Sequence, residues 1–282
     1  MINKICICGV GLIGGSFALA LKKAGFDGEI IGFGRTTENL QKAVDLSVID
    51  RFSCDIKTAV SDADLIMLAT PMLIMPIILK QIKPFLSHKP IITDVGSVKE
   101  YLIQQVTDIL GDYNNFVGAH PIAGKEKSGV EAVSCELFID KKLIITPLPN
   151  TNQNAIDELT KLWLKTGAKL QTLSPAQHDK IFSHISHLPH MLAYSLINTL
   201  HDIELDDNIF AYAAGGFSDF SRIGASDPQM WADICLTNKN NIADSLQEYI
   251  SHCQRLKQLI LTEDHYKIME LFSQAQQLRQ NL

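Results

Sequence analysis

The sequence predicts an α/β protein, with an N-terminal Rossmann-type domain built on a mostly parallel sheet, followed by an all-helical C-terminal domain. Short apolar runs alternate with helical patterns over about the first 170 residues, and a glycine-rich loop follows the first run. Strand signals nearly vanish after residue 173. Continuous apolar strands between helices are typical of a parallel sheet covered on both faces.

The elements can be assigned in chain order from these patterns. The expected strands are Lys4–Cys8, Glu29–Phe33, Leu65–Ala69, Ile91–Val95, Phe116–Ala119 and Leu143–Thr146. A helix over Leu12–Ala24 joins the first two strands, which makes this segment the first βαβ unit. In the second half, we expect long helices over Ala176–Leu200, Pro228–Leu261 and Glu263–Arg279.

The boundary between the two domains is expected at Ser174-Pro175. Ser174 suits the N-cap of a helix, and Pro175 suits its first position. We therefore divide the chain into residues 1–173 and 174–282. A helical domain with many apolar positions often pairs with a second copy, and we expect a homodimer, although the same positions can form the core of the domain itself.

Composition narrows the class of protein. The chain has 282 residues, of which 46% are hydrophobic and 20% charged, as in ordinary globular proteins. A net charge of −6 argues against a nucleic-acid partner. The longest uncharged apolar stretch, Leu65–Leu79, has 15 residues and contains Pro71 and Pro76, so we expect no membrane span. Scattered cysteines and no visible secretory signal predict reduced thiols and a cytoplasmic location.

The glycine loop has the G-x-G-x-x-G pattern of a dinucleotide site. Gly9 permits the tight turn, Gly11 lets the backbone approach a pyrophosphate, and Gly14 lets the helix pack closely on the strand. The helix N-terminus would face the phosphates. The expected cofactor-binding residues are Gly9, Gly11, Leu12, Ile13, Gly14, Arg35, Thr36, Thr70 and Pro71.

The end of the second expected strand bears on the choice of cofactor. NAD enzymes usually carry an acidic residue there, and this chain has Gly34 followed by Arg35. Arg35 could pair with the 2′-phosphate of NADP, and Thr36 offers a hydroxyl nearby. We therefore expect NADP in preference to NAD, which stays possible. In the competing interpretation, Arg35 stacks on adenine or is a solvated surface residue.

Four further clusters carry a resemblance to a known family. They are Thr93-Asp94-Val95-Gly96-Ser97-Val98-Lys99, the segment Gly118–Gly129, Ser186-His187-Leu188-Pro189-His190 and Gly215–Arg222. In order and in residues, these clusters resemble the motifs of the prephenate/arogenate dehydrogenases of tyrosine biosynthesis. The resemblance extends over nearly the whole chain. The resemblance implies a monofunctional enzyme, without a fused mutase or ACT-type domain.

The resemblance implies an oxidative decarboxylation of a cyclohexadienol. Hydride leaves ring C4 for the nicotinamide, the 4-hydroxyl loses its proton, and carbon dioxide departs as the ring becomes aromatic. Histidine is the usual proton acceptor near neutral pH, and His120 ends a strand near the expected nicotinamide. By resemblance, His120 hydrogen-bonds the 4-hydroxyl, while Ser97 contacts this histidine and helps to place the nicotinamide.

The anionic substrate needs cationic partners and hydrogen-bond donors. By resemblance, Arg222 binds a substrate carboxylate, and Ser186 and His190 bind substrate from the helical domain. Trp231 is a pocket or core residue. Lys125 stands where some family members carry a small hydroxyl residue, so it can add carboxylate affinity or change selectivity. Asp219 and Glu126 form charged gates by resemblance, or are solvated charges.

Other interpretations were weighed against this one. His178, His184, His187 and His190 have spacings that can suggest a metal site, but Pro189 interrupts the helix and no acidic or Cys ligand is placed among them, so we expect no metal. Another β-hydroxyacid dehydrogenase would usually need a catalytic lysine in the helical domain. A catalytically silent NAD(P)-binding protein would not need His120, Ser97 and Arg222 together.

Overall fold

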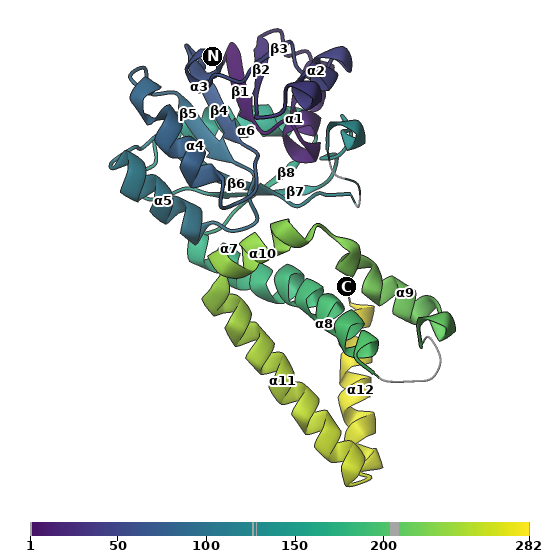
Figure 1. Cartoon of the computed structure of the whole chain (residues 1–282). Helices are drawn as coiled ribbons and strands as arrows, with labels where there is room; N and C mark the ends of the chain where they lie inside the picture. Colours follow the sequence, from purple (N-terminus) through teal and green to yellow (C-terminus); the bar gives the residue numbers. More distant parts are fainter. Residues whose placement is uncertain (1, 126, 128, 204–208, 282) are drawn as a thin grey trace.

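The computed structural model describes residues 2–125, 127, 129–203 and 209–281. The N-terminal part is built on one eight-stranded sheet in the order β3-β2-β1-β4-β5-β6-β7-β8 (Figure 1). The strands are β1 (Lys4–Cys8), β2 (Glu29–Phe33), β3 (Arg51–Ser53), β4 (Leu65–Leu68), β5 (Ile91–Asp94), β6 (Phe116–Pro121), β7 (Lys142–Thr146) and β8 (Lys169–Thr172). Neighbouring strands run parallel except β6 and β7, which pair antiparallel with His120 opposite Ile144.

All six expected strands are present, and the sheet has two more. β3 and β8 were not predicted, because they are short edge strands without a continuous apolar run. All four residues of β8 are exposed, whereas all four of β4 are buried. An apolar pattern therefore identifies the central strands but not the edges.

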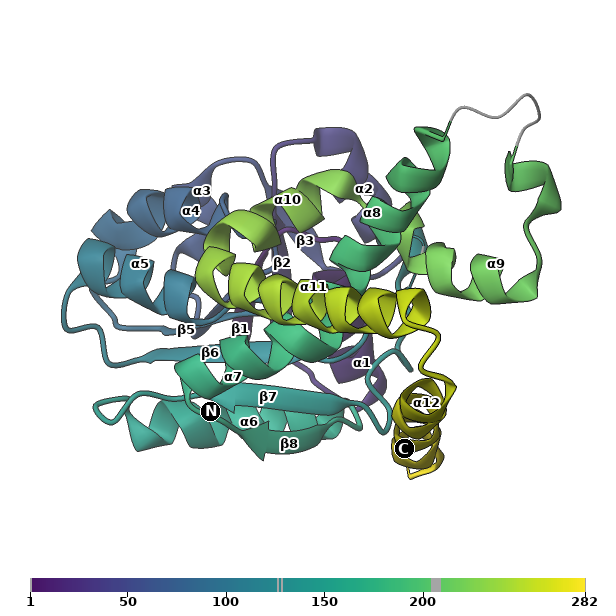
Figure 2. The same ribbon diagram turned by 90° about the horizontal axis from the view of Figure 1, so that it is seen from below.

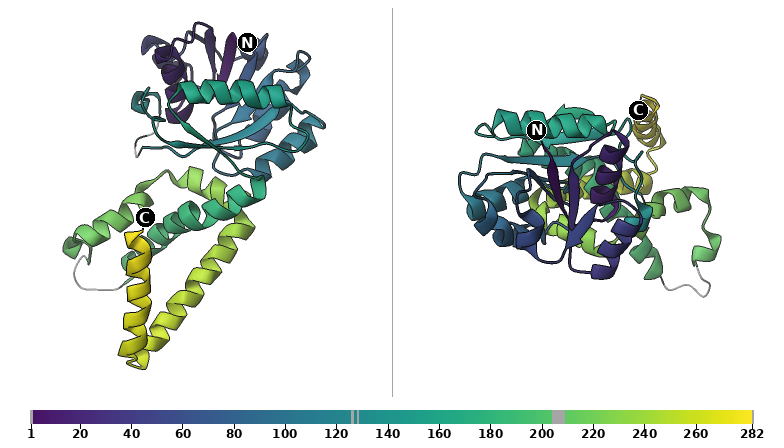
Figure 3. Two further views of the ribbon diagram at one scale, coloured as in Figure 1. Left: turned by 180° about the vertical axis from the view of Figure 1, so that it is seen from behind. Right: turned by 90° about the horizontal axis from the view of Figure 1, so that it is seen from above.

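Helices cover both faces of the sheet, as a parallel sheet requires. On one face, α1 (Leu12–Lys23), α2 (Thr37–Asp45) and α6 (Gln153–Lys165) bury a core in which the rings of Phe17 and Trp163 lie 4.6 Å apart. On the other face, α3 (Ile56–Val60), α4 (Met75–Ile82) and α5 (Glu100–Leu110) pack on the second apolar cluster. Seen from behind, the teal helix α6 crosses the sheet on the face away from α4 and α5 (Figure 3).

The chain changes direction across the sheet at β1. It adds β2 and β3 on one side of β1, then β4 to β8 on the other. Ligands of open α/β sheets bind in the crevice beyond the carboxyl ends of the strands at such a point. The loops after β1 and β4 are thereby placed at a binding crevice.

The C-terminal part is helical. It contains α7 (Pro175–Phe182), a π-helical turn (Ser183–His187), α8 (Leu188–His201), α9 (Gly215–Ser221), α10 (Pro228–Thr237), α11 (Lys239–Leu261) and α12 (His265–Gln280). Two 3₁₀ turns, Ile209–Tyr212 and Arg222–Ala225, flank α9. α11 extends away from the sheet, and α12 returns beside it (Figure 1). Among the described helices, none combines the length and apolar character needed to cross a membrane.

Two of the expected long helices were wrong as single elements. The segment predicted over 176–200 contains the π-helical turn, which separates α7 from α8. Pro189 lies in the first turn of α8, directly after the π-helical turn. The segment predicted over 228–261 breaks at Asn238, whose side-chain nitrogen donates to the carbonyl oxygen of Asp179 at 3.0 Å. The last expected helix is confirmed as α12, which begins two residues later than predicted, at His265.

The helical part is docked on the sheet domain through apolar and polar contacts. Trp231, Ile234 and Ile242 belong to the same buried cluster as the residues of α4 and α5. The backbone N–H of Leu73 also donates to the carboxylate of Asp233 at 3.2 Å. Viewed from below, α7, α10 and α11 lie across the sheet domain (Figure 2). Residues from both domains therefore meet beneath the carboxyl ends of the strands.

Candidate active site

A pocket of about 780 Å³ lies at the crevice predicted by the topology. Its walls come from the loop after β1, the end of β2, the first half of α2, the loop after β4 and residues 129–131. Six of the nine expected cofactor residues line it: Gly9, Gly11, Arg35, Thr36, Thr70 and Pro71.

The shape of the pocket fits the pyrophosphate of a dinucleotide. Gly9 has a φ of +99°, and a Cβ there would lie 2.7 Å from the carbonyl oxygen of Ala69. A Cβ on Gly11 would meet no atom within 4 Å, which leaves its backbone open to a ligand. The hydroxyl of Thr70 is buried without a hydrogen-bond partner among the described residues, so a polar ligand group would satisfy it.

The remaining three expected cofactor residues belong to the first turn of α1. Gly14 is packed so tightly that a Cβ would lie 2.7 Å from the carbonyl oxygen of Gly9. Leu12 and Ile13 are half-buried and pack their side chains on the core. Their backbone N–H groups lie in the first turn of α1, where a helix has no acceptors of its own, so a phosphate can bind them.

Cationic side chains gather where the ribose of adenosine would lie in a dinucleotide. Arg35, Asn39 and Lys42 line the same end of the pocket as Thr36. Lys42 forms an ion pair with Glu131, which lines the opposite wall. Apart from Glu131, which is paired with Lys42, the described lining of this pocket contains no acidic side chain.

His120 lies at the end of β6 and is joined to the helical domain by a hydrogen-bonded chain. Its Nδ1 lies 2.8 Å from Nε2 of His178, and Nδ1 of His178 lies 2.7 Å from Oδ1 of Asp179. His178 and Asp179 are buried on α7. The ring of Phe182 lies 5.0 Å from the ring of His120 and 4.5 Å from that of His178.

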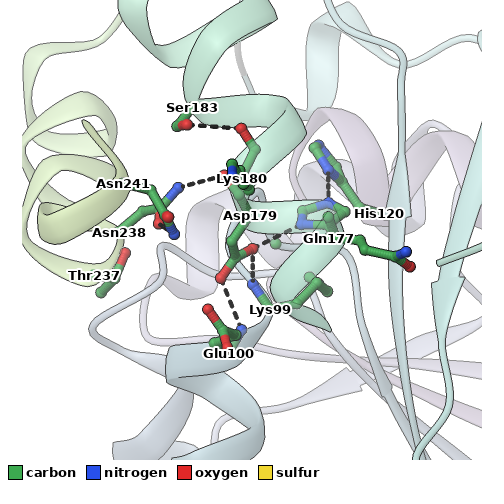
Figure 4. Close-up of polar contacts among 12 residues, drawn as sticks. Lys99, Glu100, His120, Gln177, Asp179, Lys180, Ser183, Thr237, Asn238 and Asn241 are labelled. Atoms are coloured by element: carbon green, nitrogen blue, oxygen red, sulfur yellow. Dashed lines mark hydrogen bonds and ion pairs between the residues drawn. The ribbon is translucent and has the colours of Figure 1, made fainter. Parts of the chain in front are cut away.

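Asp179 also accepts hydrogen bonds from the start of α5. The backbone N–H groups of Lys99 and Glu100 donate to its two carboxylate oxygens at 2.8 and 2.9 Å. Figure 4 shows Asp179 between these two residues and Asn238. A carboxylate from the helical domain therefore satisfies two N–H groups that the first turn of α5 leaves without helical acceptors.

A buried ion pair supports the end of β6 from the other side. Lys99 and Asp94 are both fully buried and paired through Nζ and Oδ2. Lys99 also donates to the carbonyl oxygen of Ala119 at 2.6 Å, and Asp94 accepts from the N–H of Ala119 at 3.1 Å. Both backbone groups of Ala119, the residue before His120, are thus held by the buried ion pair.

The environment keeps His120 neutral. Burial, followed by the neighbouring His178, Lys99 and His187, lowers the pKa of His120 well below the usual 6.5. Burial also lowers the pKa of His178, although its hydrogen bond to Asp179 acts in the opposite direction. A neutral imidazole can accept a proton at physiological pH, so the site suits a general base.

The π-helical turn and α8 bring further histidines to the same region. His187 is buried, and burial lowers its pKa to about 4. The ring of His190 stacks on that of Trp231, with 3.7 Å between centroids and 22° between planes. Nδ1 of His190 lies 2.9 Å from the carbonyl oxygen of Ser186, so its proton is held there and Nε2 is left as an acceptor or a site of protonation. A π-helical turn is frequent at functional sites.

A second pocket of about 600 Å³ joins the two domains. It is lined by Gly124, Lys125, Lys127, Glu131, Ala132, Val133 and Arg222. The cations Lys125 and Arg222 therefore share a wall, although they come from different domains. Three cations and one carboxylate favour an anionic ligand.

Other expected residues lie around this centre. Ser97 is half-buried in the loop between β5 and α5, near His187. His120 forms its hydrogen bond with His178, and its contact with Ser97 stays a prediction. Asp219 is exposed on α9, and Glu126 lies outside the described residues. Within the described parts of the chain, no group of three or more His, Cys, Asp or Glu side chains could hold a metal ion.

Comparison with known proteins decides the family. Residues 17–172 match the family described as "Prephenate dehydrogenase, nucleotide-binding domain". Residues 174–274 match "Prephenate dehydrogenase, dimerization domain". The chain belongs to the prephenate dehydrogenase family. The recognition of this family from the sequence clusters is thereby confirmed.

Individual relatives agree with this assignment. Prephenate dehydrogenase of Bacillus subtilis is 37% identical, over 100% of this chain and 76% of its own length. The structure of the Aquifex aeolicus prephenate dehydrogenase with hydroxyphenyl propionate and NAD+ has 38% identity and a TM-score of 0.94, covering 100% of this chain and 98% of that one. Arogenate dehydrogenase of Synechocystis is 30% identical with a TM-score of 0.82, and 99% of each chain is covered.

The sequence clusters identified His120 but not its partners. In the sequence, His178 is only one of several spaced histidines, and no pattern indicates a role for Asp179 or Lys99. The adjacent pair His178-Asp179 carried a weak signal, because a histidine followed by a carboxylate on a helix is common. Only the docking of α7 against β6 shows that this pair faces the family's histidine.

Proposed function

We propose that this chain catalyses the oxidative decarboxylation of prephenate, arogenate or both, to 4-hydroxyphenylpyruvate or tyrosine, in tyrosine biosynthesis. The observation that supports it best is the neutral, half-buried His120 at the end of β6, in a chain matched by the family over almost its whole length. The comparisons give no support to the two alternatives, which are another β-hydroxyacid dehydrogenase and a catalytically silent NAD(P)-binding protein.

The chemistry follows from the placement of His120. A dinucleotide held by the glycine loop and the loop after β4 would supply the acceptor for the hydride of ring C4. Nε2 of His120 accepts the proton of the 4-hydroxyl, whose oxygen becomes a carbonyl-like and then a phenolic oxygen as carbon dioxide leaves. Aromatisation supplies much of the driving force, so the protein mainly positions the reactants. We assign Ser97 to the placement of His120 and the nicotinamide ring.

The substrate carboxylates would be bound from both domains. Arg222 and Lys125, which line one pocket, are assigned to a carboxylate. His190 and Ser186 are assigned to substrate from the helical side. Trp231 orients His190 by stacking on its ring.

The cofactor assigned to the larger pocket is NADP in preference to NAD. Gly34 stands in place of an acidic residue, and Arg35 and Lys42 lie at the expected position of a 2′-phosphate. NAD+ is bound in the Aquifex relative, so both dinucleotides belong in the test.

We also propose the division into residues 1–173 and 174–282, with the helical domain binding substrate and forming a homodimer. β8 ends at Thr172 and α7 begins at Pro175. Several large apolar side chains of α11 and α12 are exposed, among them Tyr266, Met269 and Phe272. A second copy covering this face would bury them.

The deciding experiment is a turnover assay at the reduced-nicotinamide absorbance band. Prephenate and arogenate would each be supplied with NADP and with NAD. Turnover of either substrate supports the proposed reaction, and the better pair gives the specificity. Folded protein that binds a dinucleotide but turns over neither substrate would contradict the proposal.

A further inference from the structure

Asp179 determines where the protons lie on the two histidines of the chain that reaches His120. Its carboxylate oxygens already accept the N–H groups of Lys99 and Glu100 and act as acceptors. Nδ1 of His178, 2.7 Å away, must therefore be the donor. In a neutral His178 the lone pair is then on Nε2, which accepts from Nδ1–H of His120 at 2.8 Å. Nε2 of His120 is left with a lone pair.

Packing holds this arrangement in place. His178 is 0% exposed and Asp179 is 1% exposed, so water does not compete for their hydrogen bonds. Phe182 lies against both imidazoles. Asn238, at the break between α10 and α11, donates to the carbonyl oxygen of Asp179 and fixes the residue from behind.

The surrounding charges favour movement of a positive charge away from His120. The cation of Lys99, which is paired with Asp94, opposes a positive charge on either histidine. Asp179, at the far end, is the carboxylate in direct contact with an imidazole of this pair. A positive charge is therefore more stable on His178 than on His120.

We propose that His178 and Asp179 are positioning residues that hold His120 as the Nδ1–H tautomer and receive the charge that enters with the substrate proton. As the hydride leaves ring C4, the hydroxyl O–H bond breaks and an H–Nε2 bond forms on His120. The proton on Nδ1 of His120 passes to Nε2 of His178. His120 ends neutral, and the imidazolium of His178 lies against Asp179. This inference rests on the proposed function.

The first test is Asp179→Asn. The amide oxygen of this variant would take the place of Oδ1, which accepts from both Lys99 and His178, and the NH₂ group would face only the N–H of Glu100. The tautomers of His178 and His120 would therefore stay the same, but no negative charge would stabilise the imidazolium of His178. Because charge-assisted hydrogen bonds are about twice as strong as neutral ones, we expect kcat to fall by about 10-fold or more, with the KM for dinucleotide nearly unchanged.

Two further variants separate this role from a structural one. His178→Gln keeps an acceptor for Nδ1–H of His120 but cannot take up a proton, so kcat should fall at least as far as in Asp179→Asn. It also decides the question if Asp179→Asn does not fold. Glu248→Gln is the matched control, because Glu248 pairs with His184 at 3.2 Å on the surface. Its kcat should equal that of the unmodified protein.

The tautomer itself is read by nitrogen NMR of protein labelled with ¹⁵N-histidine, without substrate. We expect the proton of His120 on Nδ1 in the unmodified protein and in both variants, because each variant keeps an acceptor for it. Unchanged kcat in both variants, or a proton on Nε2 of His120 in the unmodified protein, would overturn the relay. If the unmodified protein turned over neither substrate, the proposed function would fail, while the NMR result would still test the tautomer.

Discussion

At the scale of single residues, this site combines neutral imidazoles with cationic side chains that line two pockets. His120 is kept neutral mainly by burial, and the dinucleotide pocket places Arg35 where a 2′-phosphate would bind. Each of these environments makes a separate prediction.

Arg35→Ala should raise the KM for NADP by about 10- to 100-fold, because a hydrogen bond to a charged group contributes about 1.5–3 kcal/mol. The KM for NAD should change little. Arg51→Ala is the control, since Arg51 pairs with Glu29 on β2, outside the pocket lining. Initial rates at varied dinucleotide measure the effect, and an equal rise for NAD and NADP would show that Arg35 does not recognise the 2′-phosphate.

Sequence patterns point to residues of one loop more readily than to partners from distant elements. Gly9 and Gly11 belong to one glycine-rich loop, and both line the larger pocket. His120 and His178 are 58 residues apart, and their contact depends on how α7 docks against β6. No local pattern encodes that docking.

At the scale of elements, the break at Asn238 shows how a buried polar side chain decides where a helix ends. The helical pattern continues through residues 228–261, but Asn238 turns its amide to Asp179 and His187. The π-helical turn likewise lies inside a continuous helical pattern. Periodicity located these helices correctly but could not show the tertiary hydrogen bonds that divide them.

Asn238→Ala should lower the free energy of unfolding by about 1–3 kcal/mol, because it leaves the buried carbonyl of Asp179 without this donor. Asn240→Ala, at an exposed position two residues later, should change it by less than about 0.5 kcal/mol. Chemical denaturation of both variants measures the difference. Equal stability would mean that the Asn238 amide does not hold the break.

At the scale of the whole molecule, several buried or half-buried histidines should make the free energy of unfolding fall as the pH falls. Burial lowers the pKa of His120, His178, His187 and His190. Below about pH 6.5 the unfolded chain binds protons that the folded state excludes, so stability falls as pH falls.

This loss should begin near pH 6.5 and continue to about pH 4, the pKa of His187. Each excluded proton contributes a slope of about 1.4 kcal/mol per pH unit. Denaturation midpoints between pH 7 and 5 measure it, above the range in which carboxylates titrate. His187→Asn should reduce the slope of stability against pH by the contribution of about one proton, roughly 1.4 kcal/mol per pH unit. A flat profile would show that these histidines titrate normally in the folded protein.

The assembly can be tested through α12. Tyr266, Met269 and Phe272 recur every three residues and are 78%, 52% and 53% exposed, so they share one apolar face. Light scattering should give twice the chain mass, and Phe272→Lys should reduce it toward one chain. Leu46→Lys, at an exposed apolar position after α2, is the control. A monomeric unmodified protein would contradict the dimer.

Because Lys99 and Glu100 donate their backbone N–H groups to Asp179, hydrogen exchange at these two amides should report separation of the domains. These two amides belong to one domain, and their acceptor belongs to the other. Their deuterium uptake should therefore be slow while the domains stay closed and should accelerate with each opening. Amides deep inside α5 bond within their own helix and would not respond in the same way. The rate at which these two positions exchange thus reports how often the active centre comes apart.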